Sequence, residues 1–132
     1  MSNDASNDLP EGDRTITVVA MPADTNPSGD IFGGWILSQM DIAGGVAASR
    51  RAEGRTVTIG VQEMEFHKPV QVGDLVSCYT RVQKVGTSSI AIEIEAWTTN
   101  HYRQGALVKV TEGVFTYVAI DENRKPRPVP KD

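Results

Sequence analysis

An α+β fold, with about five antiparallel strands curved around one long helix, is what this sequence of 132 residues predicts. Residues 35–52 form the one convincing helical segment, and their apolar side chains cover nearly the whole circumference of the helix. A helix that is apolar all round is a buried helix. Four later segments alternate between apolar and polar residues, as half-buried strands do. Short turns join most of them, which favours antiparallel neighbours.

The chain begins with a polar, acidic stretch, residues 1–13, which we expect to be disordered. A short strand follows from residue 14 and ends at Pro22, because proline cannot donate a hydrogen bond to a neighbouring strand. Its alternate apolar side chains face one side: Ile16, Val18 and Ala20. Residues 22–34 are rich in Pro, Asn, Asp, Ser and Gly, which predicts a loop before the helix.

The helix has a marked end and two glycines in its interior. Arg50 and Arg51 suit the negative end of the helix dipole, and Gly54 is expected to stop the helix. Gly44 and Gly45 lie inside the helix, where each glycine costs about 1 kcal/mol relative to alanine. We therefore expect another backbone segment to approach this face of the helix closely.

Four further strands are expected after the helix. They lie at residues 57–66, 75–85, 88–99 and 107–120, with turns at 68–74 and 86–87 and a hairpin loop at 100–105. The apolar phase slips near Gln62 and Glu63, which predicts a β-bulge. The third of these strands has the clearest alternation, with Ile90, Ile92, Ile94 and Ala96 on one face and Glu93 and Glu95 on the other. We expect the last strand to kink at Gly113.

A five-stranded sheet of this kind has an open edge strand and leaves part of the helix uncovered. Unpaired strand edges and exposed apolar surface are commonly covered by association with another chain. We therefore expect a dimer that continues the sheet.

Charge is distributed unevenly along the chain. The four acidic residues among the first 13 account for the whole net charge of −4, so the rest is formally neutral. No basic stripe is available for a nucleic-acid backbone, and we expect no nucleic-acid partner. No segment is long and apolar enough to span a bilayer, and the first residues lack the features of a signal peptide, so we expect no membrane association.

These shifts in composition divide the chain into an acidic extension (1–13), one domain (14–121) and a basic, proline-rich tail (122–132). The tail is expected to be a solvated extension, with the alternative that it holds a small anionic group.

The single cysteine, Cys78, excludes an internal disulfide and suits a reducing cytoplasm, where we place the protein. Because Cys78 alternates with valines, it is expected to be a small core residue.

Asp41 is the first candidate for chemistry, because it lies in the middle of the apolar helix with no basic residue one turn away. A buried carboxylate without a cation is costly. Two interpretations remain open at this point. Asp41 either caps a loop or pairs with a distant arginine, or it is a carboxylate whose surroundings prepare it to act as a base or nucleophile.

Gly33 and Gly34 precede the predicted helix and are the second candidates. The first N–H groups of a helix have no intrahelical acceptor and lie at the positive end of its dipole, so an anion or a polarised carbonyl could bind there. The alternative is a plain flexible lead-in. Gly33 and Asp41 are about 12 Å apart along the helix axis. If they act together, we expect them to do so across a two-fold interface.

The remaining polar candidates are less specific. Asn26 could orient a water or a carbonyl, although an asparagine that stabilises its own loop is the favoured interpretation. His67 and His101 lie in turn-like segments far from Asp41 in the sequence and are expected to be exposed loop residues, and two histidines without a cysteine or acid cluster do not predict a metal site. The G-x-S-x-G, Walker and dinucleotide-binding motifs are absent from the sequence.

Four stretches of this sequence resemble the YciA-type acyl-CoA thioesterases of the hotdog fold. They are AMPADTNPSGDIFGGWILSQMDIAGG (residues 20–45), FHKPVQVGDLVSCY, KVGTSSIAIEIEAW and FTYVAIDENRKPRPVP. The resemblance covers residues 15–130 and implies a central helix wrapped by an antiparallel sheet. It also implies a homodimer as the minimal active unit, usually within a hexamer, and hydrolysis of acyl-CoA to CoA and a carboxylic acid.

The resemblance also assigns roles to individual residues. Asp41 matches the helix carboxylate that acts as general base or nucleophile. Asn26 matches a loop asparagine that supports the reaction from the opposite subunit. The amides of Gly33 and Gly34 match the oxyanion hole. The CoA moiety is expected near a turn formed by Gly86, Thr87, Ser88 and Ser89, and Arg124, Lys125 and Arg127 are candidates for its phosphates. No metal or organic cofactor is implied beyond CoA as part of substrate and product.

Two alternatives to a thioesterase remain. One is a non-catalytic protein that binds acyl-CoA as a sensor on the same scaffold. The other is a hotdog dehydratase, which requires a histidine beside its catalytic acid. We rank the dehydratase last because both histidines lie outside the loop and helix that carry the candidate site.

Overall fold

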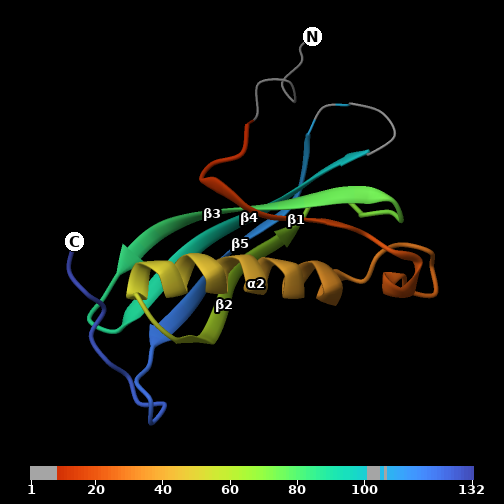
Figure 1. The fold of residues 1–132 in the computed structure, drawn as a ribbon. Helices are drawn as coiled ribbons and strands as arrows, with labels where there is room; N and C mark the ends of the chain where they lie inside the picture. Colours follow the sequence, from red (N-terminus) through yellow and green to blue (C-terminus); the bar gives the residue numbers. More distant parts are fainter. Residues whose placement is uncertain (1–8, 101–104, 106) are drawn as a thin grey trace.

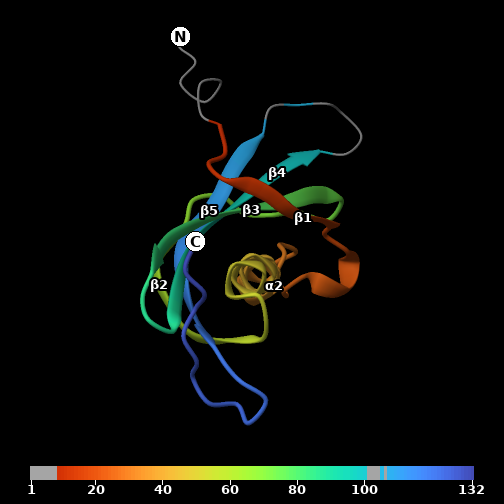
Figure 2. The same cartoon turned by 60° about the vertical axis from the view of Figure 1, so that its left-hand side comes forward.

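The computed structural model describes residues 9–100, 105 and 107–132. Its elements are β1 (Asp13–Val19), the 3-10 helix η1 (Pro22–Asp24), α2 (Gly33–Ala52), β2 (Thr56–Phe66), β3 (Asp74–Val85), β4 (Ser89–Asn100) and β5 (Val108–Ala119). A single curved sheet wraps one side of α2, as Figure 1 shows from the side and Figure 2 close to the helix axis. The predicted α+β architecture of a hotdog fold is therefore confirmed.

The sheet has the strand order β1-β3-β4-β5-β2, and all its pairings are antiparallel. The prediction that short turns join antiparallel neighbours holds for β3, β4 and β5. It fails for β2 and β3, because β2 pairs with β5 at one edge of the sheet and β3 lies beside β1. The chain therefore crosses the sheet twice, first through α2 and then through the turn that follows β2.

The predicted bulge is confirmed, since the register of β2 against β5 shifts between Gln62 and Glu65, and Glu63 has a positive φ of 57°. The expected kink at Gly113 stays a prediction: β5 runs in register with β4 across Gly113, whereas its pairing with β2 shifts there, opposite the bulge. Gly113 has another role, since the sulfur of Met64 lies where its Cβ would be. The glycine makes room for the bulged strand.

The core lies between the sheet and α2, and the alternation of β4 is confirmed. Ile90, Ile92, Ile94 and Ala96 are fully buried and form one hydrophobic cluster with Met40 and Ala43 of α2. Cys78 is a free thiol buried in the same cluster, as expected. Burial raises the pKa of the Cys78 thiol to about 12.

The helix begins two residues earlier than predicted, at Gly33, and its left-handed end residue is Glu53, with φ 54°, rather than Gly54. Gly54 N–H donates to Ser49 O at 3.1 Å, and the Arg127 guanidinium lies where a Cβ of Gly54 would be. One flank of the helix is open, because Ile42 is 54% exposed. The expected incomplete covering of the helix is therefore confirmed for the described residues.

Within the described protomer, side chains rather than another backbone approach Gly44. A Cβ at Gly44 would overlap with the Tyr117 hydroxyl and with the Ile94 side chain, so the close neighbours are side chains of the sheet. This contact brings β5 directly against the middle of the helix.

The C-terminal tail is docked on the domain, which corrects the expectation of a solvated extension. Val129 is only 7% exposed, and its N–H donates to Thr87 O at 2.8 Å. The Arg127 guanidinium donates to Ala52 O at 2.9 Å and to Ile120 O at 3.1 Å. These bonds hold the tail against the end of α2 and the turn between β3 and β4.

The described part of the N-terminal segment also contacts the sheet, since Glu11 N–H donates to a carboxylate oxygen of Glu95 at 3.2 Å. Residues 1–8 of the predicted acidic extension lie outside the described residues. In the described ranges, no helix combines the length and the hydrophobicity that crossing a membrane requires.

Candidate active site

Asp41 lies half-buried in the middle of α2, facing β2 and β5. Its Oδ1 accepts a hydrogen bond from Thr58 Oγ1 at 2.7 Å and another from the Tyr117 hydroxyl at 3.0 Å. The same hydroxyl lies 3.0 Å from the main-chain oxygen of Asp41. Among the described residues, no basic side chain forms an ion pair with Asp41. Within the described residues, Asp41 therefore neither caps a loop nor pairs with an arginine.

Both side-chain donors bind the same carboxylate oxygen, which leaves Oδ2 outside this hydrogen-bond pair. The carboxyl group is thus held in one orientation while one oxygen can act on another molecule. Burial, and next the negative charge of Asp41, raise the pKa of the Tyr117 hydroxyl, so Tyr117 stays protonated and donates.

Thr58 and Tyr117 were missed by the sequence analysis. They are direct partners in the β2–β5 register, so the pairing of two distant strands places both hydroxyls side by side. Gly44 lies one turn after Asp41, where any larger residue would displace the Tyr117 hydroxyl. The glycine inside the helix was a signal of close contact, but the sequence did not show which residue makes it.

The N-terminus of α2 is the second part of the site. Trp35 and Ile36 donate their N–H groups to Phe32 O at 3.1 and 3.3 Å, whereas Gly33 and Gly34 precede these first bonds. A Cβ at Gly34 would meet open space within 4 Å. Gly34 is exposed and its Cα is not crowded by other side chains, so a group could approach the helix start, and the oxyanion hole stays a prediction.

A groove of about 390 Å³ opens at this helix end, between the loop before α2 and the turn after β2. Its lining includes Asn26, Gly33, Phe66, His67 and Lys68. The main chain joins the two walls, because Ile31 N–H donates to Val70 O at 2.9 Å. The structure thus places Asn26 and the helix start in the lining of one groove.

Asn26 also stabilises its own loop, as the favoured interpretation of the sequence has it. Its Oδ1 accepts hydrogen bonds from the N–H groups of Ser28 at 2.9 Å and Asp30 at 3.1 Å. Because the side-chain oxygen is bound within the loop, the side-chain NH2 is the group left to contact a substrate. A role of Asn26 in the reaction stays a prediction.

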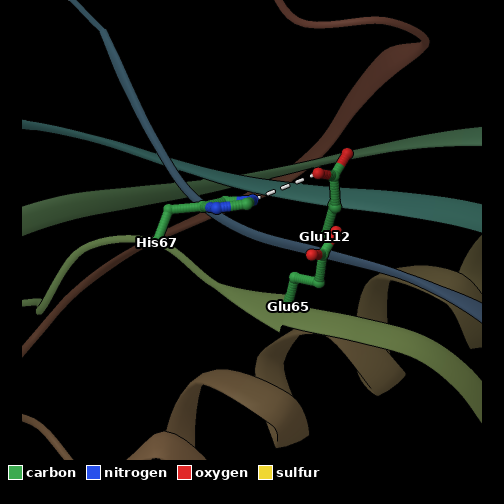
Figure 3. A group of neighbouring side chains, drawn as sticks. All are labelled: Glu65, His67 and Glu112. Atoms are coloured by element: carbon green, nitrogen blue, oxygen red, sulfur yellow. Dashed lines mark hydrogen bonds and ion pairs between the residues drawn. The ribbon is translucent and has the colours of Figure 1, made fainter.

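His67 is exposed and directly follows β2, as predicted for a loop histidine, and although it is distant from the loop before α2 in the sequence, it lines this groove. Its Nε2 is 3.1 Å from Glu112 Oε2, and Glu65 stands beside the pair (Figure 3). The expectation that no acids accompany the histidines is wrong for His67, because strand register places two glutamates next to it. We assign no ion here, and the absence of a metal stays a prediction. His101 lies outside the described residues.

Glu112 is bound on both sides, since its Oε1 is 3.0 Å from Lys109 Nζ. The hydrogen bond from Lys109 lowers the pKa of Glu112 most, partly opposed by burial, and the bond from His67 lowers it further. Glu112 is therefore a fixed, ionised partner for the imidazole.

The residues expected at the CoA moiety lie at the other end of the helix. Gly86 and Ser89 close a tight turn, with Gly86 N–H donating to Ser89 O at 2.8 Å, and Thr87 and Ser88 lie between them. A cavity of about 430 Å³ is lined by Gly86, Thr87 and the docked tail.

The three basic candidates for the phosphates differ in their surroundings. Arg124 and Lys125 are exposed. The Arg127 guanidinium already donates to main-chain oxygens of Ala52 and Ile120, so we assign Arg127 to holding the tail and no longer to the phosphates.

Asp41 and Gly33 are on one helix, about 12 Å apart along its axis, so within one protomer they cannot both reach one reacting atom. One protomer thus carries two separate candidate half-sites, a carboxylate held by hydroxyls and a helix start beside a groove. The fold and these half-sites define the class, a hotdog protein equipped for acyl-transfer chemistry.

The comparison with known proteins agrees with this class. Residues 28–103 match the model of the thioesterase superfamily. The acyl-CoA thioester hydrolase YciA of Salmonella typhimurium is 51% identical over 123 residues, covering 92% of each chain. YciA of Escherichia coli is 48% identical over 127 residues, covering 95% of this chain and 96% of its own.

Solved structures show the same relationship. A hexameric thioesterase from Yersinia pestis superposes with a TM-score of 0.89 at 52% identity, covering 94% of this chain and 100% of its own. A hexameric broad-specificity acyl-coenzyme A thioesterase gives 0.87 at 46% identity, covering 95% of this chain and 86% of its own. The chain therefore belongs to the thioesterase superfamily, among the YciA-type acyl-CoA thioester hydrolases.

Proposed function

We propose that this protein hydrolyses the thioester of acyl-CoA to free CoA and a carboxylic acid. The observation that carries the proposal is the Asp41 carboxyl group, held through one oxygen by Thr58 and Tyr117. An oriented carboxylate without a cationic partner is suited to take a proton or to attack a carbonyl. The YciA relatives, which bear the name of acyl-CoA thioester hydrolases, support the same reaction.

The thioester carbonyl binds at the start of α2 in one protomer. Its oxygen accepts hydrogen bonds from the amides of Gly33 and Gly34, which lie at the positive end of the helix dipole. Negative charge develops on this oxygen during attack, and each fixed donor stabilises it by about 3–4 kcal/mol in comparable sites. The side-chain NH2 of Asn26 supports the substrate from the same groove.

Asp41 of the second protomer completes the reaction. Its Oδ2 either removes a proton from an attacking water or attacks the carbonyl directly and forms an anhydride that water then opens. The C–S bond breaks and CoA leaves as a thiolate, which is a good leaving group. We therefore propose a reaction without a metal or an organic cofactor.

The proposal requires a dimer, and the surface of the protomer favours one. β2 is an edge strand of the described sheet, with Ile59 60% exposed. Beside it, a cavity of about 530 Å³ runs between β2 and α2, with exposed Ile42 in its lining. A second copy that continues the sheet at β2 would cover both surfaces. Because the solved relatives are described as hexameric, we propose a hexamer built from such dimers.

CoA is placed at the turn formed by Gly86, Thr87, Ser88 and Ser89. The cavity between this turn and the docked tail supports this placement. Exposed Arg124 and Lys125 are proposed to neutralise its phosphates.

The buried, free thiol of Cys78 is consistent with the reducing cytoplasm, which we propose as the compartment.

A steady-state assay with short acyl-CoAs and a thiol reagent tests the proposal. Continuous thiol release that is lost in Asp41→Asn supports hydrolysis. Saturable binding of acyl-CoA without thiol release would instead identify a sensor and overturn the proposal. A series of acyl chain lengths in the same assay would determine the preferred substrate.

A further inference from the structure

Phe66 is an apolar side chain beside the start of α2, and the reaction proposed above does not use it. It is the last residue of β2 and is 53% exposed. A Cβ at Gly33 would lie 3.6 Å from Cε2 and 3.6 Å from Cζ of the Phe66 ring. Apolar atoms within about 4 Å of one another are in contact. The ring edge therefore stands next to the helix residue whose amide is proposed to bind the thioester oxygen.

The main chain fixes the position of Phe66 relative to the helix start. Phe66 pairs with Thr111 of β5, and the N–H of the next residue, His67, donates to a main-chain oxygen of β5 at 2.7 Å. The turn that follows is joined to the loop before α2, because Ile31 N–H donates to Val70 O at 2.9 Å. Strand pairing and this loop contact together hold the ring at the mouth of the groove.

The groove that Phe66 lines has an apolar floor. Three further lining residues are buried and apolar: Ile31, Ile36 and Val70. Two of its polar lining residues already have partners, since Asn26 Oδ1 accepts bonds within its own loop and His67 Nε2 lies 3.1 Å from Glu112 of β5. An acyl chain needs no hydrogen-bond partner, whereas the pantetheine arm of CoA brings amides that do. The acyl chain is therefore the part of the substrate that this floor suits better.

We infer that Phe66 is a specificity-determining residue, whose ring contacts the first carbons of the acyl chain and sets the preference for chain length. The inference rests on the proposed hydrolysis at the start of α2. Each methylene group that leaves water for an apolar wall strengthens binding roughly fourfold. Because the chain keeps this contact in the transition state, the effect appears in kcat/KM.

The test measures kcat/KM for acetyl-CoA, butyryl-CoA and hexanoyl-CoA by thiol release in the wild type and two variants. Acetyl-CoA is the reference, because its acyl group contains no methylene. In Phe66→Ala we expect the ratio of butyryl-CoA to acetyl-CoA to fall roughly fourfold for each methylene that loses its contact. Phe66→Leu keeps an apolar wall and should retain a ratio within about twofold of the wild type.

Val72→Ala is the matched control. Val72 is 46% exposed in the same turn but does not line the groove, so its loss should leave the ratio unchanged. Phe66→Trp is a second measurement that does not depend on the folding of Phe66→Ala. A larger ring narrows the groove, so hexanoyl-CoA should lose more kcat/KM than acetyl-CoA does.

A butyryl-to-acetyl ratio that stays at the wild-type value in Phe66→Ala would overturn the inference. A loss by the same factor for all three substrates would also overturn it, because it would place the ring against the CoA arm or in the dimer contact. If the wild type itself releases no thiol from any of the three, the proposed function fails instead.

Discussion

Tyr117→Phe isolates the hydroxyl that orients Asp41 without disturbing the core. The ring of Tyr117 is 1% exposed, and phenylalanine retains its packing. Only the hydrogen bonds to Asp41 Oδ1 and to the main-chain oxygen of Asp41 are lost. The expected effect on folding is therefore the loss of a hydrogen bond to a charged group, about 1.5–3 kcal/mol of unfolding free energy.

The effect on turnover follows from how the carboxyl group is held. A hydrogen bond to a charged group contributes roughly 1.5–3 kcal/mol, and each 1.4 kcal/mol corresponds to a factor of about ten. Thr58 still binds Oδ1 at 2.7 Å after the change, so orientation is lost only in part. We expect kcat to fall about tenfold in Tyr117→Phe and by a similar factor in Thr58→Val.

The double variant tests the shared oxygen. Because either hydroxyl alone restrains the carboxyl group, removing both should cost more than the product of the single losses. The assay is steady-state thiol release from a short acyl-CoA, with unfolding curves recorded in parallel. A folded double variant whose kcat stays within about twofold of the wild type would refute the idea that these hydroxyls prepare Asp41 for catalysis.

Three further substitutions and one labelling experiment test the site and its support. Asp41→Asn keeps the acceptors for Thr58 and Tyr117 but should lower kcat at least about 100-fold, as expected for loss of a general base or nucleophile. Asn26→Ala should have a smaller but measurable effect in the same assay, and an unchanged rate would leave Asn26 a loop residue only. Gly44→Ala should destabilise the fold by about 1–3 kcal/mol in denaturant unfolding, because the added methyl group overlaps with the Tyr117 hydroxyl. Cys78 should resist iodoacetamide at neutral pH in the native protein and react after unfolding, since its raised pKa of about 12 keeps the thiol protonated.

These outcomes need matched controls. Gly34→Ala is the control for Gly44→Ala in unfolding, because a Cβ there meets open space, although the same change can affect catalysis. Native-state alkylation of Cys78 as fast as in the unfolded protein would contradict its burial. An Asp41→Asn variant with near-wild-type turnover would remove Asp41 from the proposed mechanism.

Much of the local structure was predictable because neighbours in the sequence determine it. The alternation of Ile90, Ile92 and Ile94 was enough to predict a buried strand face, and the phase slip at Gln62 was enough to predict the bulge. An aspartate in an apolar helix was likewise sufficient to single out Asp41. Each of these signals lies within one element, where the periodicity of side chains is set by backbone geometry.

The sequence by itself determined one buried helix, its wrapping strands and the candidate acid at its centre. The tertiary structure alone decided the place of β2 beside β5, which pairs Thr58 with Tyr117 and brings both to Asp41. Tyr117 and Asp41 are 76 residues apart in the chain, and no local pattern relates them. The tertiary structure also decided the position of His67 in the groove at the start of α2 and the docking of the tail through Arg127. The physical reason is that strand order and register depend on the packing of the whole core, whereas periodicity depends only on adjacent residues.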